Sequence, residues 1–158
     1  MTQLTRPGNG AERKKTMEKI LIGGQALRML GSKRSTDDFD YLINEKNLPL
    51  FSKSDTGDDL LNAAKSKFFA EIWKLETGNE MAGTQSLLEL KAFAFVEHCQ
   101  NRFFQKADDC EYDIKFLIRL GAGRLEIAHK YMTMGQASEI NGIIDNVKKE
   151  GGTSWNTK

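Results

Sequence analysis

Two carboxylates, Asp38 and Asp40, lie one residue apart at the start of an apolar run that ends at Ile43. Residues two apart in a strand point to the same side, so these side chains lie roughly 7 Å apart at the backbone. Carboxylates this close repel each other unless one takes up a proton or a cation lies between them. A divalent ion held by such a pair is typical of phosphoryl-transfer sites. The alternative is a solvated pair at a strand end, neutralised by Lys33 or Arg34.

A pair of glycines, Gly23 and Gly24, follows a short apolar run and precedes a helical pattern. The free backbone N–H groups of such a turn, together with the N-terminus of the helix, are suited to binding phosphate. A tight connection with no ligand is the competing interpretation. The spacing from Gly24 to Gly31, which is followed by Ser32, excludes a Walker loop, and a Rossmann fingerprint is missing.

The elements that position these residues form a small sheet followed by a helical half, so we expect a mixed α/β (α+β) fold. Short apolar runs bounded by glycine or polar residues predict the strands. The expected strands are residues 19–22, 39–43 and 58–62, with a short extended stretch near 48–52. Helical periodicity and capping signals predict the helices. The first three are residues 25–30, 63–76 and 85–104. A fourth begins at a capping box formed by Asp108 and Glu111 and runs to about residue 120. A segment over 124–134 follows, and a last helix runs from Ser138 to Gly151-Gly152.

The domain organisation follows from the same pattern. Residues 1–16 are polar and lack apolar periodicity, which predicts a flexible N-terminal arm, and we expect the fold to begin at Met17. Residues 17–150 are expected to form a single domain, with its sheet part over about 17–76 and its helical part over about 84–150. Residues 151–158 are expected to be a disordered tail.

Composition narrows the class of protein. The chain of 158 residues is 39% hydrophobic and 28% charged, with a net charge of +1, so no global field favours nucleic acid or membrane. It contains no apolar run of the roughly 18 residues that a membrane span needs. Its two cysteines lack zinc-site spacing, and the N-terminus lacks a signal-peptide pattern. We therefore expect a cytoplasmic protein with no membrane partner.

The stretch GGQALRMLGSKRSTDDFDYLI resembles the opening of the nucleotidyltransferase superfamily, which has the polymerase-beta-like fold. It is most similar to the minimal bacterial branch that includes the toxins of abortive-infection type IV systems. These proteins share G-G-x-A, a glycine some five residues later, R-x-T/S-x-D-x-D and an apolar strand. In this sequence the pattern falls on Gly23, Gly24, Ala26, Gly31, Arg34, Thr36, Asp38 and Asp40.

The helical half carries a second, weaker similarity to that family, whose pattern there is K-x-x-A, then R, then K-D-x-x-D-I. The matching positions are Lys91, Ala94, Arg102, Lys106, Asp109, Asp113 and Ile114, with an acidic spacing one residue longer than the pattern. On a helix Lys91, His98 and Arg102 would fall within about 20° of one another. For Lys91 and Arg102, two roles remain open: a phosphate ligand, or a salt bridge to Asp109 or Asp113.

The resemblance implies a nucleotidyltransferase that uses Mg²⁺ (or Mn²⁺), with a nucleoside triphosphate as substrate. Asp38 and Asp40 would hold the metal, and a third carboxylate would act as base on the acceptor hydroxyl. We favour Asp59 for this role, since a short strand beside residues 39–43 would aim it inward; Asp58 and Glu71 are the alternatives. The residues that would bind the nucleotide or its phosphates are Gly23, Gly24, Gln25, Arg34, Thr36, Lys91 and Arg102.

The acceptor that the resemblance implies is RNA or protein, and the protein would be a toxin or defence component with a cognate antitoxin as partner. One position departs from the polymerase-like members: Gln25 stands where they have Ser or Thr, whose hydroxyl holds the triphosphate. The alternative hypothesis is therefore a catalytically inactive module of the same fold, with a binding or inhibitory role. A plain metal- or nucleotide-binding regulator is a third.

Overall fold

Four short strands form one mixed sheet in the computed structural model, which describes residues 17–156. The strands are β2 (Ile20–Ile22), β3 (Asp40–Ile43), β4 (Phe51–Lys53) and β5 (Asp59–Asn62). Their order in the sheet is β2-β3-β5-β4, with β3 and β5 parallel and each edge strand antiparallel to its neighbour. The predicted N-terminal arm, residues 1–16, lies outside the described residues.

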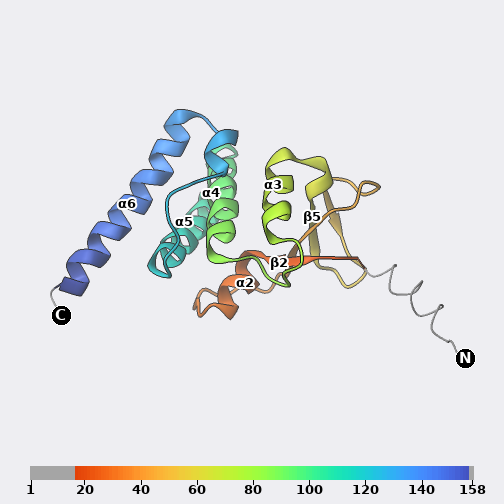
Figure 1. Cartoon of the computed structure of the whole chain (residues 1–158), viewed down its shortest axis with the longest axis horizontal. Coiled ribbons are helices and arrows are strands. Elements are labelled where there is room, and N and C mark those ends of the chain that lie inside the picture. The colour runs from red at the N-terminus through yellow and green to blue at the C-terminus, as the bar shows by residue number, and fades with distance from the viewer. Residues whose placement is uncertain (1–16, 157–158) are drawn as a thin grey trace, which may run out of the picture.

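The helices stand mostly on one side of this sheet (Figure 1). Helix α2 (Gly23–Met29) follows β2 directly, and α3 (Lys67–Glu76) follows β5 after a short 3-10 turn, η1 (Ala63–Lys65). Then come α4 (Thr84–Gln100), α5 (Phe104–Arg119), a second 3-10 turn η2 (Ala128–Tyr131) and α6 (Met134–Asn156). In Figure 1, α3 lies between the strands and the pair α4 and α5, and α6 lies at the far end.

Apolar contacts join the sheet part and the helical part into one core. Phe68 of α3 stacks on Phe93 of α4, with ring centroids 4.5 Å apart. Helices α4 and α5 pack side by side through fully buried residues such as Leu88 and Ile114, and α6 adds Ile144 to the same core. Burial of such side chains is the main favourable term in folding.

The predicted mixed α+β class is confirmed, and the strands lie where short apolar runs predicted them, within a few residues. Several helix boundaries were wrong. Helix α5 begins at Phe104, before the predicted capping box, and Asp108 makes no cap. Residues 124–134 contain only the turn η2, and α6 begins at Met134 rather than after Ser138. It also continues to Asn156, past Gly151-Gly152, into residues predicted to be a disordered tail.

Helix α4 was predicted to reach residue 104, but it ends at Gln100. Arg102 follows in the left-handed region, with φ 62°, and the N–H of Phe103 donates to the carbonyl of His98 at 2.8 Å. This is a helix-terminating turn, and it lets α5 return alongside α4. Arg102 is therefore not on the helical face of Lys91.

Within residues 17–156, every helix is too short or too polar to cross a lipid bilayer.

Candidate active site

One row of residues across the sheet carries the site. Strand pairing sets Ile22 opposite Asp40, Asp40 opposite Asp59, and Asp59 opposite Lys53. Residues paired in this way on neighbouring strands have their side chains on the same face. This acidic row therefore places the carboxylates of Asp40 and Asp59 side by side, with the ammonium group of Lys53 at its end. Lys53 forms an ion pair with Asp59.

The double glycine lies directly against this row, because Gly23 follows Ile22 in the chain. Gly23 has φ +72°, and a Cβ at this position would overlap the carboxylate of Asp40. A Cβ on Gly24 would lie 2.6 Å from Cγ2 of Thr36. Both positions require glycine for close approach, the first to the acidic row and the second to the loop that precedes β3. The predicted neighbourhood of the glycine turn and Asp40 is present in the structure.

The electrostatics of Asp40 reflect this crowding. Its pKa is raised from 3.8 to about 6, first by burial and then by the neighbouring charge of Asp59, whereas the charge of Lys91 lowers it. A hydrogen bond with Asp59 and the charge of Asp38 add to the rise. A carboxyl pair with these properties either shares a proton or binds a cation.

A buried charge cluster holds Lys91 close to Asp40. Asp113 of α5 is fully buried, and Lys91 of α4 contacts it at 3.0 Å. Arg34 makes a bidentate contact with the same carboxylate, at 2.8 and 2.6 Å. Asp109 lies 3.9 Å from Arg34 at the surface. Two cations thus share one buried carboxylate, which fastens the loop before β3 to both long helices.

A cavity of about 230 Å³ opens beside this cluster. Its polar side contains Gly23, Asp40 and Lys91, and most of the remaining wall is apolar. The apolar and remaining residues come from the sheet and from α3 and α4: Ile22, Leu50, Phe51, Leu61, Ser66, Phe69, Leu87, Leu90, Phe93, Ala94 and Glu97. A few converging polar groups at one end of an apolar cavity are typical of a small-molecule site.

Two predicted phosphate ligands have structural partners. The Gln25 side-chain amide donates to the Thr36 carbonyl at 2.9 Å, so it ties α2 to the loop before β3. Arg34 binds Asp113, and this hydrogen bond raises the pKa of the guanidinium above its ordinary value. The structure thus supports the salt-bridge role for Lys91 while also placing Lys91 in the cavity wall.

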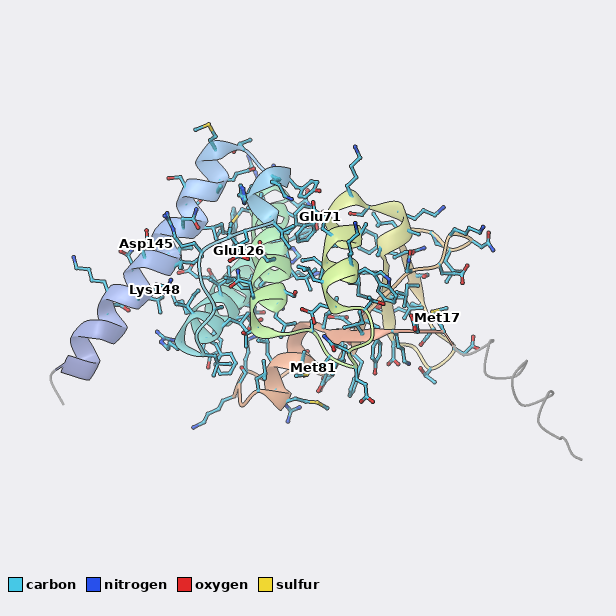
Figure 2. All side chains as sticks on the ribbon, viewed as in Figure 1. Met17, Glu71, Met81, Glu126, Asp145 and Lys148 are labelled. Atoms are coloured by element: carbon cyan, nitrogen blue, oxygen red, sulfur yellow. The ribbon has the colours of Figure 1, made fainter. Side chains whose placement is uncertain are left out.

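Three other predicted or weighed positions lie elsewhere. Arg102 is exposed after the end of α4 and is absent from the cavity wall, so its placement beside Lys91 was wrong. Asp38 is exposed in the loop before β3, rather than in a strand with Asp40. Glu71 lies on the side of α3 that faces η2 (Figure 2), where it binds Lys130 at 2.6 Å and also Tyr131. Of the weighed third carboxylates, Asp59 is the one adjacent to Asp40.

The oxygen donors of the row suit Mg²⁺, which binds through one or two carboxylates together with substrate phosphates. Asp40 and Asp59 provide such a pair, and the repulsion that raises the pKa of Asp40 is what a divalent ion would relieve. Among the described residues no group of three His, Cys, Asp or Glu side chains forms a ready-made metal site. The fit to a metal therefore rests on the two carboxylates of Asp40 and Asp59. Asp38 lies close enough for its charge to raise the pKa of Asp40.

Comparison of the chain with protein-family models, with curated proteins and with solved structures gave no match.

Sequence reasoning missed Lys53 and the aromatic wall of the cavity. Lys53 joins the site through the pairing of β4 with β5, and a strand register of this kind is not visible in three residues of sequence. The pairing of Arg34 with Asp113 spans 79 positions. Its signal in the sequence was the acidic position at 113, which the sequence offers as a salt-bridge partner of Lys91 or Arg102.

Proposed function

We propose that this protein is a Mg²⁺-dependent nucleotidyltransferase, which transfers a nucleoside monophosphate from a nucleoside triphosphate to an RNA or protein hydroxyl. The observation that supports this most is the acidic pair Asp40 and Asp59 on adjacent parallel strands, with Gly23 packed against Asp40. The resemblance of residues 20–43 to the minimal nucleotidyltransferases is the second support.

Each part of the site has a role in this proposal. Asp40 and Asp59 supply the oxygens that would hold the ion, with Asp38 in the loop just before them, and the N–H groups of the glycine turn would face the phosphates. A bound Mg²⁺ supplies charge neutralisation for the triphosphate. Lys91, held by Asp113, adds positive charge at the cavity wall. The apolar wall, with Phe51 and Phe69, provides surface for a nucleobase.

The transfer step is a substitution at the α-phosphorus. The acceptor oxygen forms a bond to the α-phosphorus, and the bond to the bridging oxygen breaks, so that pyrophosphate leaves. Asp59 takes the proton from the acceptor hydroxyl. It suits this role because it is half-exposed, with 39% of its side chain accessible, whereas Asp40 is more deeply buried.

The biological setting follows from the family resemblance. We propose a cytoplasmic toxin or defence component that is neutralised by a cognate antitoxin.

A transfer assay tests the proposal. The protein is incubated with each α-³²P-labelled nucleoside triphosphate, Mg²⁺ or Mn²⁺ and total RNA, and the label is followed into RNA and into protein. The matched comparison is the double variant Asp40→Asn/Asp59→Asn. We expect metal-dependent labelling by the natural chain and at least a hundredfold loss in the variant. Labelling that survives the double substitution would contradict the proposed site. Nucleotide binding without transfer would favour an inactive module of this fold.

A further inference from the structure

The acidic row ends in a cation that the chain itself provides. Lys53 is the last residue of the edge strand β4 and lies opposite Asp59 in the pairing. Its ammonium group forms an ion pair with Asp59, yet 68% of the Lys53 side chain is exposed. The next residue along the same row is Asp40, so the ammonium lies at the solvent side of a carboxylate pair.

All three carboxylates of the site act on this ammonium. The hydrogen bond with Asp59 raises the pKa of Lys53 above its ordinary 10.5, and the charges of Asp59, Asp38 and Asp40 add to the rise. The group therefore stays positively charged at neutral pH and lies in the field of the same oxygens that would hold a divalent ion. Its ion pair is with Asp59, and the charges of Asp40 and Asp38 act on it from farther away.

The backbone that carries Lys53 is anchored to the sheet, while its side chain is largely exposed. The amide of the fully buried Asn62 donates to the carbonyls of Glu45 and Leu48, which holds the loop between β3 and β4 on the sheet. The side chain beyond this anchor is a flexible four-carbon stem at an exposed edge. Exposed ion pairs are weak, and a divalent ion carries twice the charge of an ammonium group.

We propose that Lys53 is an internal counter-ion that occupies the cation position of the Asp40–Asp59 pair, and that a divalent ion must displace it to bind. The proposal rests on the proposed function, because it takes the pair as the metal site. Lys53 then sets the metal affinity of the site and keeps the acidic row neutralised until metal and nucleotide arrive together. A purely structural bridge would instead tie β4 to β5 and leave the metal affinity unchanged when it is removed.

The test is a calorimetric titration of the full chain with Mn²⁺, carried out on the natural protein and on four variants. Lys53→Met removes the charge and keeps the stem, and Lys53→Arg keeps the charge. Lys46→Met makes the same charge change beyond the other end of β3, and Asp40→Asn disables the proposed metal site. The Mn²⁺-induced rise of Tm is measured for each variant as a second readout.

We expect Lys53→Met to bind Mn²⁺ about three- to fivefold more tightly than the natural chain, which is the range that an exposed ion pair allows. Lys46→Met and Lys53→Arg should stay within about twofold, and the metal-induced rise of Tm should be larger in Lys53→Met. Unchanged or weaker binding by Lys53→Met would overturn the counter-ion role while leaving the metal site in place, provided Asp40→Asn loses binding. If the natural chain does not bind Mn²⁺, or if Asp40→Asn binds Mn²⁺ as tightly as the natural chain does, both proposals are overturned.

Discussion

The fold changes the pKa of a carboxyl in the site, that of Asp40. Burial and the charge of Asp59 raise its pKa to about 6, whereas an unfolded chain would titrate near 3.9. Because the folded value is the higher one, the stability that Asp40 contributes is fully present below about pH 4. It is lost as the pH rises through about 6.

This shift predicts a pH dependence of stability in metal-free protein. Between pH 5 and pH 7 the natural chain should lose about 1 kcal/mol of unfolding free energy relative to Asp40→Asn, after allowance for solvent screening. Urea unfolding of both proteins in a chelating buffer measures the difference. If the difference in unfolding free energy between the two proteins is the same at pH 5 and at pH 7, the pKa of Asp40 is not raised in the folded state.

Gly23 gives a second prediction at the residue scale. Gly23→Ala combines an unfavourable φ of +72° with an overlap against the Asp40 carboxylate, so we expect a loss of about 2–3 kcal/mol in unfolding free energy. Gly31→Ala is the matched control, since Gly31 has φ +107° with open space around it and reports the backbone cost alone. Equal losses in urea unfolding would mean that Asp40 does not crowd Gly23.

At the scale of elements, the charge cluster around Asp113 joins the loop before β3 to α4 and α5. Removing one partner of a buried ion pair leaves uncompensated charge, so Asp113→Asn should lower the unfolding free energy by about 3 kcal/mol. Asp109→Asn changes a more exposed carboxylate 3.9 Å from the same arginine and should cost less than about 1 kcal/mol. Chemical denaturation of the two variants compares them, and similar losses would contradict a central role for Asp113.

The elements that the sequence predicted well are those with strong local signals. The strands β2, β3 and β5 are short apolar runs bounded by glycine or charged residues, and helical periodicity indicated α3, although this helix begins at Lys67 rather than at residue 63. The misplaced boundaries depend on packing instead. Helix α5 begins before Asp108 because Ala107 is already buried in the helical core, and burial there outweighs a capping signal.

The site shows the same division between local and distant information. The glycine turn and the D-x-D spacing are local, so the proximity of Gly23 and Asp40 could be predicted. The adjacency of Asp59 followed from expecting a strand beside β3, but its pairing with Lys53 depends on register. Arg34 and Lys91 both bind Asp113, which lies on α5, far from Arg34 in the sequence. Nothing in the residues next to Arg34 or Lys91 indicates whether they bind Asp109, Asp113 or a phosphate.

On the scale of the whole molecule, the sheet supplies the acidic row and the helical half supplies the cation above it. The cavity between β3, α3 and α4 belongs to both parts, with Asp40 from the sheet and Lys91 from α4 (Figure 1). Arg34, in the loop before β3, joins the two parts because it binds Asp113 of α5, and the same carboxylate holds Lys91. We therefore expect metal and nucleotide to bind together.

The dependence of nucleotide binding on the ion shows whether metal and nucleotide occupy one site. Binding of a non-hydrolysable nucleoside triphosphate analogue is measured by calorimetry with Mn²⁺ and with chelator, for the natural chain and for Asp40→Asn. We expect the ion to strengthen nucleotide binding by the natural chain at least tenfold, and we expect Asp40→Asn to lose this gain. Equal nucleotide affinity with and without the ion, or an undiminished gain in Asp40→Asn, would rule out the proposed metal site.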